Sequence, residues 1–137
     1  MSNKRFEIVE HTADWALRVF GRDLAQLLIH AAEGMASLLV EDPAAITVGA
    51  ERHVELAAGD AESLLVEWLS ELAYWAEMEQ LIFTQFELST VAPTHLEATV
   101  RGGRAPELQK HIKAVTYHNL EIIQTEAGLE ATVVFDV

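Results

Sequence analysis

The chain has 137 residues, half of them hydrophobic, and its 22 acidic and 9 basic side chains give a formal net charge of -13. This length fits one domain with one core, and the absence of repetitive or Ser/Gly-rich tracts argues against a disordered segment. The sequence has no cysteine, which excludes disulfides and thiolate metal sites. We therefore expect a single domain over residues 1–137, with no membrane span and a cytoplasmic location.

The negative charge is spread along the chain. A field of this sign opposes phosphate backbones, because nucleic-acid binding depends mainly on Lys and Arg that neutralise phosphates. We expect no direct binding of nucleic acid, so that any link with RNA requires a basic partner. A surplus of glutamate that only keeps the protein in solution would explain the same charge.

Two strands and a helix are predicted in the first forty residues. Alternating apolar side chains place the strands over 5–9 and 15–20, with a polar bend between them. Asp23, followed by Gln26, is typical of a helix N-cap with its capping-box partner. Apolar residues then recur every three or four positions, so the helix ends near Val40.

The middle of the chain predicts a strand over 46–58 and a second helix over 60–79, which Asp60 caps. Glu67 and Glu71 share the solvated face of this helix. Its apolar stripe consists of Leu65, Trp68, Leu69, Leu72 and Ala76. The apolar arc is wide, so we expect the helix to be covered on more than one side.

The remainder of the chain shows strand patterns only. Strands are predicted over 83–90, 95–101, 112–118, 120–125 and 129–136, with turns at Ala92-Pro93, Gly102-Gly103 and Ala127-Gly128. The order of elements predicts an α+β fold in which two helices pack on one face of a mixed, largely antiparallel sheet. The sequence contains no dinucleotide fingerprint, P-loop or nucleophile elbow.

A dense polar cluster, Glu10-His11-Thr12-Ala13-Asp14, separates the first two strands. A tight turn needs fewer polar groups, so the cluster is a candidate for a corner that carries ligands. The simpler explanation is that Thr12 and Asp14 accept hydrogen bonds from loop amides.

A second candidate is the end of the chain, where Asp136 and the carboxyl group of Val137 lie within one residue. Alternation turns Phe135 towards the core and Asp136 to the opposite side, although an acid at a chain end is more often simply solvated. If the two segments meet, Asp14, Asp136 and Val137 form an all-oxygen cluster suited to a hard divalent cation. Calcium tolerates irregular geometry better than magnesium, and zinc is disfavoured.

Three further polar residues are candidate neighbours of these acids. His11 would bind the ion or, preferably, orient a carboxylate through a hydrogen bond. Thr116 and His118 share one face of their predicted strand, where a solvent-facing polar stripe is the ordinary explanation. Asp14, Asp136 and His118 would make a metal-assisted hydrolase on paper, but no nucleophile-base spacing supports it, so we expect no catalytic reaction.

Taken together, these segments resemble the archease family. The resemblance is carried by HTAD at 11–14, GDAESLL at 59–65, WLSEL at 68–72, KAVTYH at 113–118 and FDV at 135–137. In this order and spacing the motifs are highly specific, and the resemblance covers nearly the whole chain.

The resemblance implies a fold related to strand-helix-strand-strand modules and a non-catalytic role beside the RNA ligase RtcB, which joins tRNA exon halves. Archeases promote guanylylation of that ligase and permit multiple turnovers. The metal site of the family maps onto Asp14, Asp136 and an oxygen of Val137. The alternative is a general chaperone or protein-interaction module whose carboxylates are structural.

Two features depart from the family pattern. Trp15 follows HTAD where a small or aliphatic residue is common, and the stretch 102–111 differs from the usual acidic loop. These departures concern the shape of the partner surface.

Overall fold

The computed structural model describes residues 4–10 and 14–137. In chain order the elements are β1 (Phe6–Glu10), β2 (Trp15–Gly21), α1 (Leu24–Leu39), the short 3-10 helix η1 (Pro43–Ala45), β3 (Ala50–Ala57), α2 (Ala61–Glu79), β4 (Leu81–Ala92), β5 (His95–Arg104), β6 (Ala114–Thr116), β7 (Ile123–Thr125) and β8 (Gly128–Asp136). Among these residues, neither helix combines the length and apolar character that a membrane crossing requires.

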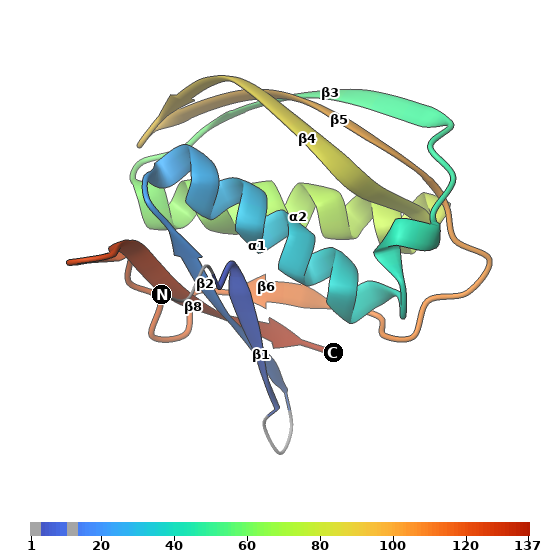
Figure 1. The fold of residues 1–137 in the computed structure, drawn as a ribbon, viewed down its shortest axis with the longest axis horizontal. Coiled ribbons are helices and arrows are strands. Elements are labelled where there is room, and N and C mark those ends of the chain that lie inside the picture. Colours follow the sequence, from blue (N-terminus) through green and yellow to red (C-terminus); the bar gives the residue numbers. More distant parts are fainter. Residues whose placement is uncertain (1–3, 11–13) are drawn as a thin grey trace.

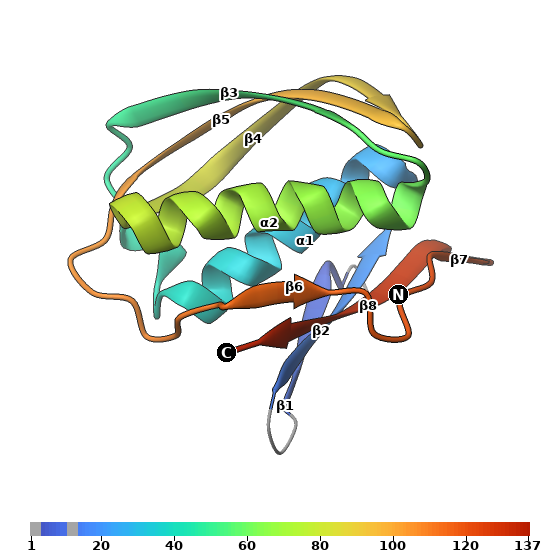
Figure 2. The same cartoon turned by 180° about the vertical axis from the view of Figure 1, so that it is seen from behind.

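The chain forms three layers, with the two helices between two sheets (Figure 1, Figure 2). Sheet A has the strand order β1-β2-β8-β6, with β7 also paired to β8, and sheet B has the order β3-β5-β4. All strand pairs in the described part of the chain are antiparallel. The predicted α+β class is confirmed, but the helices lie between two antiparallel sheets and not on one mixed sheet.

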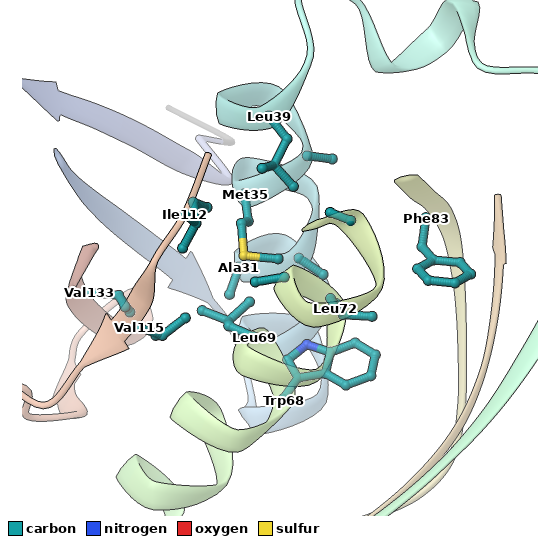
Figure 3. Packing of buried hydrophobic residues seen from close by; sticks show 14 of the residues in the cluster. Ala31, Met35, Leu39, Trp68, Leu69, Leu72, Phe83, Ile112, Val115 and Val133 are labelled. Atoms are coloured by element: carbon teal, nitrogen blue, oxygen red, sulfur yellow. The ribbon is translucent and has the colours of Figure 1, made fainter. Parts of the chain in front are cut away.

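The apolar circumference of α2 explains why two sheets are needed. On one side, the ring of Trp68 meets Phe86 of sheet B edge-on, with 6.0 Å between the centroids. On the other side, Leu69 lies towards Val115 and Val133 of sheet A (Figure 3). One sheet would leave half of this apolar surface in water. The expectation that the second helix is covered on more than one side is therefore confirmed.

The first helix begins where its capping residues predict. The Asp23 side chain accepts a hydrogen bond from the Gln26 amide at 2.9 Å, and Gln26 Oε1 accepts one from the Arg22 amide at 2.8 Å. Inside the helix layer, Trp68 Nε1 donates to the carbonyl oxygen of Leu28 at 2.9 Å. This bond satisfies the indole N–H in the core and ties α2 to α1.

The predicted turn at Gly102-Gly103 is wrong, because both glycines lie within β5. A Cβ atom at Gly102 would lie 1.9 Å from the carbonyl oxygen of Ile82, and one at Gly103 would lie 1.9 Å from that of Thr47. The glycines therefore permit close backbone approach in a strand and do not reverse the chain. As a result, β5 continues to Arg104.

Candidate functional site

One end of sheet A brings the two predicted acids together. Trp15, the first residue of β2, pairs with Phe135 of β8, so Asp14, which directly precedes β2, and Asp136 belong to the same end of sheet A. Phe135 is buried in the core and Trp15 packs against the same core. Side chains alternate along a strand, so Asp136 of β8 lies on the outer face, away from Phe135. Asp136 is exposed and Asp14 is half-buried.

The backbone around Asp136 is held firmly. Its carbonyl oxygen accepts a hydrogen bond of 2.7 Å from the Lys113 amide, and Ala114 of β6 lies opposite it in the register. Val137, the third residue of the predicted metal site, is half-buried and packs against the core. These contacts restrain the backbone of Asp136, and with it the position from which the Asp136 side chain extends.

Thr116 lies on the same face of sheet A as Asp136, one row further along the sheet. It stands opposite Val134, and its hydroxyl donates to the Val134 carbonyl oxygen at 2.9 Å. The same Oγ1 accepts a hydrogen bond from the His118 amide at 3.3 Å. In the structure, Thr116 therefore fixes the turn after β6.

His118 does not lie in a strand, because β6 ends at Thr116 and is shorter than the predicted 112–118. The strand runs away from Asp136, so His118 lies beyond the far end of β6. Its ring is exposed, with Nε2 3.3 Å from Asn119 Nδ2. A place on the partner surface stays a prediction for His118, and His11 lies outside the described residues.

The two segments that depart from the family pattern contact one another. The ammonium of Lys110, in the stretch 102–111, lies 3.8 Å from the centroid of the Trp15 ring. This is a cation–π contact. Since Trp15 directly follows Asp14, the two departures form a single local feature beside the acidic end of sheet A.

A second group of possible metal ligands was not predicted from the sequence. Glu55 of β3 and His95 and Glu97 of β5 each offer one ligand atom, and these atoms lie within 4.8 Å of one another. Within residues 4–10 and 14–137, these three side chains form a candidate metal site. Polar residues at alternate positions mark the outer face of both strands, but only the register places Glu55 opposite Glu97.

A cavity of about 550 Å³ lies between α2 and the residues that lead into β6. Tyr74 and Met78 line it from the helix, and residues 111–115 line it from the other side. The two helical side chains are 58% and 64% exposed. Beside them, His111 Nδ1 lies 2.9 Å from Glu77 Oε2. Exposed apolar side chains beside an edge strand make this a candidate protein-contact surface.

The comparison with known families matches residues 6–137 to the Archease protein family. The chain belongs to the archease family. A relative named protein archease from Methanosarcina mazei is 33% identical over 142 residues, covering 98% of this chain and 97% of the relative. Another, from Methanothermobacter thermautotrophicus, is 31% identical and covers 98% of this chain and 99% of the relative.

Two solved structures share this fold. The solution structure of Methanobacterium thermoautotrophicum protein 1598 has a TM-score of 0.77 and 29% identity, covering 96% of this chain and 98% of that one. The crystal structure of a Thermotoga maritima protein described as an archease and possible chaperone has a TM-score of 0.62 and 22% identity, with full coverage of both chains. The resemblance to the archease fold is therefore confirmed in three dimensions.

Proposed function

We propose that this chain is a non-catalytic, cytoplasmic activator of the tRNA-splicing RNA ligase RtcB, which promotes guanylylation and multiple turnover of the ligase. The observation that supports the proposal is that the β2–β8 pairing ends between Asp14 and Asp136, which leaves both at one end of sheet A in a member of the archease family. The remaining support comes from the charge and the donor atoms around these two residues.

The acidic end of sheet A has the donor set of a hard-cation site. A cation bound between the two carboxylates would offset their negative charge. Asp14, Asp136 and an oxygen of Val137 would hold the ion, and calcium is the preferred candidate because it accepts irregular oxygen geometry. When bound, the cation would keep both carboxylates side by side and leave its remaining positions for a partner.

The overall charge favours a protein partner over RNA. With a formal net charge of -13, the chain repels phosphate backbones, whereas an RNA ligase must present basic surface to its substrate. Complementary charge accelerates encounter and fixes orientation more than it raises affinity. The acidic end of sheet A would therefore dock near the nucleotide-binding region of the ligase and favour its guanylylated form.

A ligation assay tests the role. The ligase from the same organism is incubated with GTP, Mn²⁺ and excess RNA, with or without this chain. The chain alone should join no ends, and its addition should raise guanylylation and carry the ligase beyond one turnover. Asp14→Asn and Asp136→Asn should each reduce the stimulation roughly tenfold or more, by analogy with the loss of metal-site residues elsewhere.

Glu67→Gln is the matched control, because it makes the same change in net charge on the exposed face of α2. Equal loss in all three variants would assign the effect to overall charge. Calcium titration of the same proteins should give one site per chain, lost in both aspartate variants while their circular dichroism stays native. Absence of stimulation by the unmodified chain, with an active ligase, would refute the proposed role.

The cavity beside α2 supports a second candidate, a general chaperone. Exposed Tyr74 and Met78 offer an apolar surface to an unfolded segment. A chaperone would suppress the aggregation of an unrelated, heat-unfolded enzyme, and Met78→Lys would abolish that effect. An activator of one ligase would leave the aggregation unchanged, and Met78→Lys would matter only if this surface also contacts the ligase.

A further inference from the structure

The outer face of sheet B carries a cluster that is independent of the acidic end of sheet A. Glu55 of β3 stands directly opposite Glu97 of β5, and His95 lies two residues before Glu97 on the same face. One ligand atom from each side chain lies within 4.8 Å of the other two. His95 Nε2 is 3.7 Å from Glu55 Oε2. Sheet B lies on the opposite side of the helix layer from sheet A (Figure 2).

The cluster differs from the rest of its own sheet face. Further along the face, Arg101 neutralises two acids, with Nε 2.8 Å from Glu51 Oε1 and Nη1 3.2 Å from Glu87 Oε1. Glu55 and Glu97 are instead carboxylates directly opposite each other, an arrangement that destabilises a sheet unless the charge is offset. The imidazole beside them offsets it only when protonated. A bound cation would offset the charge of both carboxylates.

We propose that Glu55, His95 and Glu97 bind a divalent transition-metal ion, with Zn²⁺ as the best match. One imidazole nitrogen and two carboxylate oxygens suit zinc, which accepts three protein ligands and a water molecule. Zinc bonds of about 2.1 Å place tetrahedral ligands roughly 3.4 Å apart. Small side-chain rotations close the present spread of up to 4.8 Å, since Glu55 is exposed and the other two residues are half-buried.

Neighbouring contacts prepare the cluster for this role. The hydroxyl of Thr90 on β4 donates to Glu97 Oε2 at 3.1 Å, which leaves Oε1 for a metal and restricts the carboxylate. The inner-facing neighbours Leu96 and Ala98 are fully buried, so the strand that carries His95 and Glu97 is held by the core. The ion would join β3 to β5 and keep one or more coordination positions open to solvent.

Titration calorimetry with ZnCl₂ tests this site, with the full chain carrying Asp14→Asn and Asp136→Asn as the starting protein. That background removes the proposed hard-cation site, so the result does not depend on the proposed function. We expect one Zn²⁺ per chain and a Tm that rises with zinc concentration, because the ion binds the folded state. His95→Ala and Glu97→Gln should each weaken zinc binding at least tenfold.

His53→Ala is the matched control, because His53 lies on the same outer face of β3, two residues from Glu55, and opposite Thr99. Zinc binding that survives His53→Ala but not His95→Ala would establish the site. Equal zinc affinity before and after His95→Ala would overturn the proposal. The proposal would also fail if the starting protein, with Asp14→Asn and Asp136→Asn, bound no zinc. Native circular dichroism of each variant excludes unfolding as the cause.

Discussion

Each sheet carries two carboxylates of a proposed metal site, but the third proposed ligand differs. At the end of sheet A, Asp14 and Asp136 are joined by an oxygen of Val137, which directly follows Asp136. In sheet B, Glu55 and Glu97 have the His95 imidazole within reach. If both proposals hold, the third ligand decides which class of ion fits: a hard ion at sheet A and zinc at sheet B.

The two sheets also differ in how the chain builds them. Sheet B joins segments from the middle of the sequence, with β4 and β5 consecutive, whereas the centre of sheet A pairs β2 with β8 from opposite ends. Both sheets nevertheless pack on the same two helices. The acidic end of sheet A therefore depends on the longest-range pairing in the fold, while the cluster in sheet B depends on a more local one.

Core truncations on either side of the helix layer should have the largest effect and test whether the sheets unfold together. Phe83→Ala in sheet B should lower the free energy of unfolding by about 3 kcal/mol, and Val133→Ala in sheet A by about 2 kcal/mol. Both side chains are at most 4% exposed. Urea denaturation followed by circular dichroism and tryptophan fluorescence should give one shared transition for each variant.

The predicted single domain rests on that shared transition. Two separated transitions in either variant would show that one sheet can unfold while the other persists. The two sheets would then belong to two units that unfold independently, and not to one shared core.

A smaller effect is expected at the Trp15 and Lys110 contact, which is special to sheet A. A double-mutant cycle with Trp15→Leu and Lys110→Met should give a coupling energy of about 0.5 kcal/mol, the lower end of the range for cation–π pairs. Lys113→Met serves as the control, because it also removes a lysine near the same edge. A coupling energy as large for Trp15 with Lys113 would show that the lysines act only through general charge.

The smallest expected effect is the pH dependence of stability that Glu7 of β1 contributes. The Lys4 ammonium, 2.7 Å from Glu7, lowers the pKa of Glu7 through a hydrogen bond and through its charge, with a further contribution from Arg18. A carboxyl group whose folded pKa lies below its unfolded value of 4.5 stabilises the fold above that value. That stabilisation is lost as the pH falls through the lower, folded pKa.

Glu7→Gln should therefore be less stable than the unmodified chain at neutral pH and equally stable in strong acid. Thermal unfolding between neutral pH and about pH 3 would measure the difference. Glu67→Gln is the matched control, because it makes the same change in net charge on α2. If the two variants follow the same curve, the ion pair on β1 contributes nothing specific.

Local signals in the sequence were sufficient for the helices. Asp23 with Gln26 begins α1, and the Asp60 side chain accepts the Ser63 amide hydrogen at 2.7 Å to begin α2. Caps and apolar periodicity act within a few residues, so they can be read along the chain. The residue types at the candidate site can also be read along the chain. Asp14 lies between two predicted strands and Asp136 lies at the end of another, and these positions predict both as candidate ligands.

The tertiary structure decided how these pieces meet. Only the pairing of β2 with β8 brings Asp14 and Asp136 to the same end of a sheet, and only the register of β3 and β5 puts Glu55 opposite Glu97. The pairing of β6 with β8 ends at Thr116, so His118 lies beyond the end of β6. Strand partners, register and the division into two sheets depend on contacts between distant segments, and a period-two pattern shows which face a residue takes but not which strand it will face.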